Sequence, residues 1–162
     1  MHIRHVDNDR LNSSRNTNLE DGDEIIKIIK ENYKGKVINI GHVHVDDKQF
    51  INIKHELLNF EYLNLFKHAQ CYIGDASGPT VIAQFIGIKS FLYNIFPFNF
   101  KTSNKKSIIL YKALNQNLLN LDYNFINLLH YDYQLKKFKV SFKDVKINQI
   151  KKNLIPFLKE LT

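Results

Sequence analysis

The sequence predicts an α/β protein, a Rossmann-like parallel sheet with helices on both faces. The order strand, loop, helix, strand occurs twice, once over residues 1–41 and again over residues 71–93. Such a repeat favours parallel strands joined by right-handed crossovers. No linker or low-complexity segment divides the chain, and its length suits one domain. We therefore expect a single domain over residues 1–162.

The first unit opens with a short strand at residues 1–6, which a polar loop follows. Thr17 and Glu20 have the spacing of a capping box, so we expect a helix to begin near Glu20. Isoleucines at helical spacing give that helix one apolar face, and Gly35 marks its end. The second strand is expected at 37–41.

The rest of the chain repeats these signals less regularly. Pro79 suits the first turn of a helix that Gly87 closes, and Pro156 should kink or break the last helix. The expected elements are an extended piece at 50–53, a helix at 57–69, a strand at 71–73, a helix at 79–86, a strand at 89–93, a loop at 94–107, a strand or short helix at 108–111, a helix at 121–129 and a helix at 147–161.

Charge and composition limit the classes of partner. The net charge is +7, but the lysines are dispersed, no arginine stripe occurs, and the Asn, Ile and Lys content is typical of an AT-rich genome. We therefore expect no nucleic-acid partner. The single Cys71 excludes an internal disulfide and fits a reducing compartment. Without a membrane-length apolar run or a signal peptide, the expected location is cytoplasmic, with at most peripheral contact at the inner face of the membrane.

The turn Gly74-Asp75-Ala76-Ser77-Gly78 joins a predicted strand to a predicted helix. Small residues there leave backbone N–H groups accessible at a helix N-terminus, which is a ready site for a phosphate. Thr80 could add its hydroxyl to the same phosphate oxygens. The alternative is a tight turn that needs small residues for its geometry alone.

Three short motifs carry a resemblance to a known family. The turn above, the pair Arg15-Asn16 and the tripeptide His2-Ile3-Arg4 resemble the "GD-x-SG", "RN" and "H-x-R" patterns of a family of bacterial glycosyltransferases of the GT-B type. Heptosyltransferases have a similar "DSGP" turn, and fucosyltransferases a similar "H-x-R" strand. The resemblance extends roughly from Ile3 to Phe98. It implies the nucleotide-sugar-binding half of a GT-B fold, a glycan or lipid-linked acceptor, and a role in surface polysaccharide synthesis.

The resemblance also implies roles for single residues. Arg4 and Arg15 would hold the donor diphosphate, because the planar guanidinium can bind two phosphate oxygens at once. His42 follows Gly41 at a strand end and would bind phosphate or sugar. The nucleotide-sugar is the substrate, and no cofactor, metal or catalytic residue is assigned. The substrate-binding residues expected are Arg4, Arg15, Asn16, Gly41, His42, Gly74, Asp75, Ser77, Gly78 and Thr80.

Three points leave alternatives open. Residues 79–86 contain no Asp or Glu, although many GT-B enzymes hold the donor ribose with an acidic residue in this helix. His42 and His44 alternate along a strand, but the pattern of ligands is incomplete for zinc. A GT-B enzyme has two Rossmann-like domains and this chain has room for one, so a separately encoded acceptor domain is expected, or the chain is truncated. A non-catalytic nucleotide- or phosphosugar-binding module is the alternative.

Overall fold

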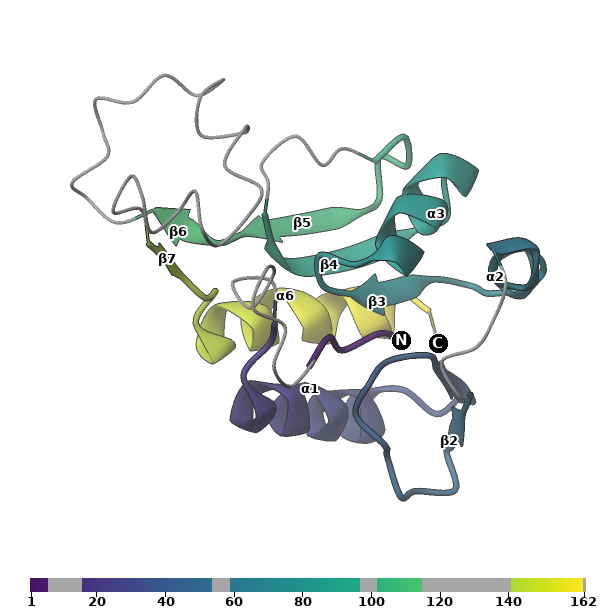
Figure 1. Ribbon diagram of the computed structural model, residues 1–162. Helices are drawn as coiled ribbons and strands as arrows, with labels where there is room; N and C mark the ends of the chain where they lie inside the picture. The colour runs from purple at the N-terminus through teal and green to yellow at the C-terminus, as the bar shows by residue number, and fades with distance from the viewer. Residues whose placement is uncertain (6–15, 54–58, 97–101, 115–140, 162) are drawn as a thin grey trace.

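The computed structural model describes residues 1–5, 16–53, 59–96, 102–114 and 141–161 (Figure 1). The predicted helix at 121–129 lies outside these residues, as does the start of the helix predicted at 57–69. Within them, no helix is both long and apolar enough to cross a membrane. The helices are α1 (Leu19–Asn32), α2 (Asn59–Lys67), α3 (Gly78–Ile86) and α6 (Ile147–Lys159). The strands are β1 (Val37–Asn39), β2 (Phe50–Asn52), β3 (Tyr72–Gly74), β4 (Ser90–Ile95), β5 (Ile108–Tyr111), β6 (Ala113–Leu114) and β7 (Phe142–Lys143).

The strands pair mainly in parallel. β1 pairs with β2, and β3 pairs with β4, which pairs with β5, all in parallel register. The first segment, residues 1–5, lies between these two groups. His2 forms a parallel bridge with Gly74 on one side, and the N–H of Ile40 donates to the carbonyl of Met1 at 2.9 Å on the other. A short antiparallel pair, β6 with β7, leads into α6.

The resulting order in space is β2, β1, the first segment, β3, β4 and β5. Counted along the chain, this is third, second, first, fourth, fifth and sixth, an order found in doubly wound α/β sheets. It confirms the predicted parallel run through Ile3, Ile38, Ile73 and Phe91. The order reverses between the first segment and β3, so the switch point of the sheet lies there.

Apolar side chains cover both faces of the sheet. Ile73 and Phe91 belong to one core cluster with the buried residues of α1 and α6, which lie side by side in Figure 1. Tyr72 and Leu92, their neighbours along the strands, belong to a second cluster with residues of α2 and α3. Successive strand residues point to opposite faces. The mixed α/β arrangement is therefore compatible with a Rossmann-like fold that has helices on both faces.

Helix α1 begins one residue earlier than predicted, and its cap differs from the prediction. The side chain of Asn18 accepts a hydrogen bond from the N–H of Glu20 at 3.1 Å, so Asn18 is the N-cap. The predicted capping box of Thr17 and Glu20 is wrong, because the Thr17 hydroxyl donates to Asp75 instead. A buried carboxylate competes successfully with the helix terminus for that donor.

Strand β4 is longer than predicted, and the loop expected from residue 94 is wrong at its start. β4 continues to Ile95, although Asn94 has a positive φ of 51° and the register with β5 shifts nearby. Asn tolerates this backbone region better than most residues. Its side-chain oxygen accepts the N–H of Val145 at 2.7 Å, which ties β4 to the segment entering α6. Residues 108–111, for which sequence periodicity was ambiguous, form β5.

Helix α6 passes through Pro156 and continues to Lys159, so the predicted break does not occur. Pro156 is exposed and lies in the last turn, while Leu154 and Phe157 bury the apolar face. That burial stabilises the helix although the N–H of residue 156 is missing.

We expect Pro156→Ala to raise the free energy of unfolding by roughly 1–2 kcal/mol, which is less than the ~3 kcal/mol that a proline costs at the centre of a helix. Urea unfolding checks this, and an unchanged midpoint would contradict it.

Candidate functional site

The residues predicted to bind substrate gather at the switch point of the sheet. The first segment and β3 are adjacent parallel strands, and their carboxyl ends lead to Arg4 and to the loop before α3. Open α/β sheets bind ligands at this position, because the chains leaving the two strands diverge and open a crevice.

Asp75 accepts several hydrogen bonds at the carboxyl ends of these strands and is fully buried. Its carboxylate accepts the backbone N–H of Arg4 at 2.5 Å and the hydroxyl of Thr17 at 2.8 Å. Nδ1 of the buried His2 lies 3.1 Å from the other carboxylate oxygen. Hydrogen bonds to a charged acceptor are stronger than neutral ones. Asp75 therefore fastens the first segment to the loop before α3, and its oxygens face protein donors.

The hydroxyls of Ser77 and Thr80 hold the same loop from inside. Both donate to the backbone carbonyl of Asp75, and the Thr80 hydroxyl also lies 3.0 Å from the Tyr72 hydroxyl. Burial raises the pKa of Tyr72 above its ordinary value, so this hydroxyl stays neutral at physiological pH. The hydroxyls of Ser77 and Thr80 are buried and bonded inward, which gives them a structural role in this conformation.

The first turn of α3 faces outward from this loop. Ser77 is the N-cap residue, but its side chain makes no capping hydrogen bond, since it is bonded to Asp75 instead. Gly78 is exposed, and a Cβ atom there would have nothing within 4 Å. The N–H groups of a first helical turn carry partial positive charge and need an acceptor. Pro79 has no N–H group and Thr80 is buried, so Gly78 is the exposed residue of this turn that carries such a donor.

Gly41 and Gly74 have packing reasons for lacking a side chain. A Cβ at Gly41 would lie 2.5 Å from the backbone nitrogen of Ile3, and one at Gly74 would meet the ring and hydroxyl of Tyr72. The exposed His42 ring packs edge-to-face on His2, with 5.5 Å between centroids. These contacts place His42 at the switch point and explain Gly41 and Gly74 as positions of close approach.

The polar loop after the first segment returns to the same edge. The N–H of Thr17 donates to the carbonyl of Arg4 at 2.8 Å, which brings the adjacent Asn16 beside Arg4. Arg15 lies outside the described residues. The structure thus brings together Arg4, Asn16, Gly41, His42 and the 74–80 loop and helix start.

The predicted set of substrate-binding residues left out His2, Thr17 and Tyr72, although His2 belongs to the "H-x-R" pattern. For Thr17 and Tyr72 the only signal was indirect: a carboxylate between small residues in a predicted buried turn needs donors from its neighbours. Among the described residues, no three His, Cys, Asp or Glu side chains lie close enough to hold a metal ion together.

Comparisons with family models, with curated proteins and with solved structures found no match. The chemistry of the edge is therefore inferred from its own residues. They comprise the arginine Arg4, a helix N-terminus without a side-chain cap, and a buried carboxylate whose oxygens accept protein donors. This combination suits an anionic ligand.

Proposed function

We propose that the chain is the donor-binding domain of a GT-B-like glycosyltransferase, which transfers a sugar from a nucleotide-sugar to a glycan or lipid-linked acceptor in bacterial surface polysaccharide synthesis. The observation that carries the proposal is the hydrogen bond from the Arg4 backbone N–H to Asp75, which holds Arg4 beside the loop that leads into α3, at the switch point of a parallel sheet. The resemblance of the three sequence motifs to those of glycosyltransferases implies that the bound anion is the diphosphate of a nucleotide-sugar. The donor is a substrate, and no metal or other cofactor is assigned.

In this proposal the edge stabilises the leaving group. The acceptor hydroxyl attacks the anomeric carbon, the bond from that carbon to the diphosphate oxygen breaks, and the nucleoside diphosphate leaves with the electron pair. The Arg4 guanidinium and the N–H groups of α3 would offset the charge that develops on the diphosphate. The acceptor site and the base that removes the hydroxyl proton are assigned to a second domain.

The test is calorimetric titration of UDP-, GDP-, ADP- and CMP-sugars into the wild type and two variants. Gly78→Asp puts a carboxylate where the phosphate should lie, and a Cβ atom at Gly78 meets no other atom within 4 Å. Arg4→Ala removes the charged donor. We expect each variant to weaken the preferred nucleotide-sugar at least about tenfold, or about 1.4 kcal/mol.

The matched control is Gly78→Ala, which keeps the backbone N–H group and adds no charge. It should bind within about twofold of the wild type, a difference of less than about 0.5 kcal/mol. Unchanged binding by both Gly78→Asp and Arg4→Ala would place the phosphate elsewhere. Binding without sugar transfer, in the presence of acceptor and a candidate second domain, would favour the non-catalytic module.

A further inference from the structure

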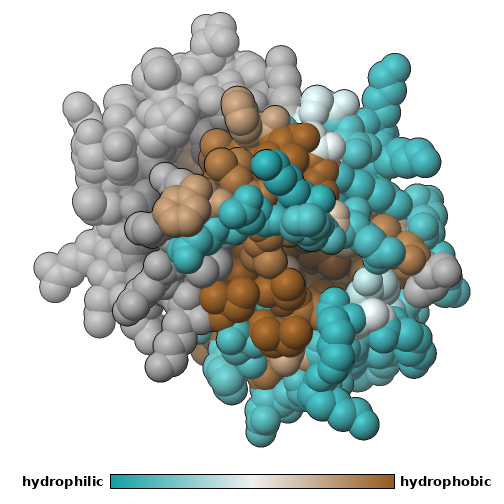
Figure 2. Space-filling model, turned by 90° about the vertical axis from the view of Figure 1, so that its right-hand side faces the viewer, coloured by the Kyte–Doolittle hydropathy of each residue, from teal (hydrophilic) through white to brown (hydrophobic). Residues whose placement is uncertain are grey.

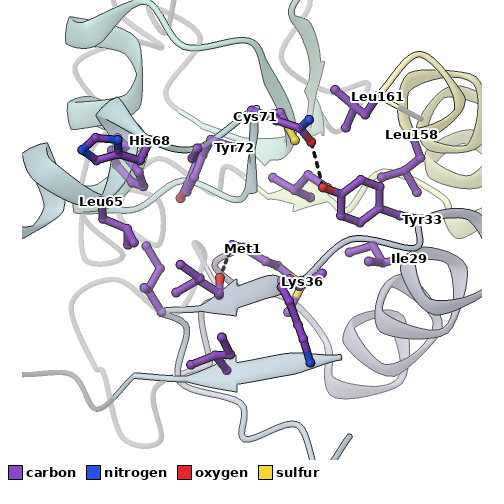
Figure 3. Close-up of a pocket in the computed structure, with 18 residues that line it drawn as sticks. Met1, Ile29, Tyr33, Lys36, Leu65, His68, Cys71, Tyr72, Leu158 and Leu161 are labelled. Carbon is purple, nitrogen blue, oxygen red and sulfur yellow. Dashed lines mark hydrogen bonds between the residues drawn. The ribbon is translucent and has the colours of Figure 1, made fainter. Parts of the chain in front are cut away.

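A cavity of about 310 Å³ is lined by residues of β1, β3, α1, α2 and α6 (Figure 3). Val37 at the start of β1 and Tyr72 at the start of β3 line it, so it lies at the amino ends of the parallel strands. The ends of α1, α2 and α6 close its sides through Tyr33, Leu65 and Leu158. The cavity is therefore separate from the site proposed for the nucleotide-sugar.

The wall of this cavity is mainly apolar. Figure 2 views the side of the molecule on which α2 and β2 lie, and apolar side chains gather there around a hollow, with hydrophilic residues on the right of the view. The volume falls at the lower end of the range for small-molecule sites, which are mostly apolar. The apolar lining residues are Met1, Ile29, Val37, Ile38, Ile40, Ile51, Leu65, Phe66, Ala69, Ile73, Leu158 and Leu161.

The single cysteine of the chain, Cys71, indicates how poorly charge is solvated inside this cavity. Cys71 lines it beside Tyr72, and burial raises the pKa of the thiol to about 11. A raised thiol pKa shows that the charged form is poorly solvated there. The cavity wall thus disfavours charge in its interior.

The polar groups of the cavity are basic or already paired. The Tyr33 hydroxyl donates to the side-chain oxygen of Gln70 at 2.8 Å. Among the described residues that line the cavity none is acidic, whereas Lys36 and His68 are both exposed and contribute to the lining. The Lys36 ammonium donates to the carbonyl of Lys48 at 2.8 Å, and an ammonium has donors left for another acceptor. The rim therefore favours a negative group.

We propose that this cavity binds a ligand with one aliphatic chain and an anionic head group, such as an alkyl phosphate or a fatty acid. The chain lies among the aliphatic side chains, and the head group stays at the rim beside Lys36. This site does not depend on the function proposed for the opposite edge.

The experiment uses decyl phosphate below its micelle concentration, with binding followed by calorimetry and by the rate at which Cys71 reacts with a thiol reagent at pH 9. Decyltrimethylammonium offers the same chain with the opposite charge, and inorganic phosphate offers the head group alone. We expect decyl phosphate to bind with one-to-one stoichiometry and to slow the reaction of Cys71. Neither of the other probes should protect Cys71, and equal protection by either would overturn the proposal.

Two variants locate the binding. Lys36→Glu should weaken decyl phosphate roughly fivefold, because an exposed attraction becomes a repulsion. Lys34→Glu is the matched control, since Lys34 is exposed, has the same charge and does not line the cavity; it should change the affinity less than about twofold. Equal losses in the two variants would overturn the rim contact. No binding of decyl phosphate, or a dimer in which Cys71 is protected without ligand, would overturn the proposal as a whole.

Discussion

Replacing Asp75 with alanine should lower the free energy of unfolding by about 3–5 kcal/mol, the typical loss when one member of a buried charged cluster is removed. The change deletes the acceptor of the part-buried Arg4 N–H and of the buried Thr17 hydroxyl. A buried donor that loses its partner has lost its hydration without compensation. Urea unfolding monitored by circular dichroism measures the loss.

Two further variants test whether the loss of stability comes from the hydrogen bonds of the Asp75 carboxylate or only from the removal of a negative charge. Asp75→Asn keeps the size of the side chain, but its NH₂ group must face a donor, so we expect a smaller loss than for alanine. Asp23→Ala removes an exposed carboxylate from α1 and should change stability by less than about 0.5 kcal/mol. If Asp75→Ala were no worse than Asp23→Ala, the network at the switch point would contribute nothing to folding.

Gly41→Ala should be the second most damaging change. The new Cβ would lie 2.5 Å from the nitrogen and 2.9 Å from the oxygen of Ile3, both backbone atoms. Relief requires the first segment to move away from β1, which would disturb the hydrogen bond from His42 N–H to the Ile3 carbonyl. Overpacking of this kind costs about 1–3 kcal/mol, occasionally more. The unfolding midpoint in urea and the one-dimensional proton spectrum check it.

Gly78→Ala is the matched control for that experiment, since it makes the same chemical change where nothing lies within 4 Å. Alanine in a helical turn restricts the unfolded chain, so this variant should be neutral or stabilised by up to about 1 kcal/mol. Equal losses in the two variants would show that Gly41 is not a position of close approach.

The local elements were largely readable from the sequence, because their signals lie within a few residues of one another. The isoleucine spacing marked α1, Pro79 and Gly87 marked the two ends of α3, and Gly87 does adopt the positive φ of 76° that such a cap requires. The repeated unit was enough to predict parallel pairing of β3 with β4. The small-residue turn before α3 was likewise visible as a candidate anion site.

Other features depended on contacts between distant residues. The sequence suggested Thr17 as a helix cap, and only the folded chain shows it donating to a carboxylate 58 positions away. The same holds for His2, which meets Asp75 across 73 positions. Gly41 was assigned to ligand binding, whereas its contact with Ile3 accounts for it by packing.

The sequence by itself was enough to predict helices where α1, α3 and α6 form, the parallel pairing of β3 with β4 and a small-residue turn before α3, since hydrophobic periodicity and turn chemistry are local properties. The tertiary structure alone decided which side chains lie beside that turn and which of them form its buried hydrogen bonds. The physical reason is that a buried carboxylate such as Asp75 must find its donors wherever the fold brings them. Those donors come from strand ends and loops that are neighbours only once the sheet has formed.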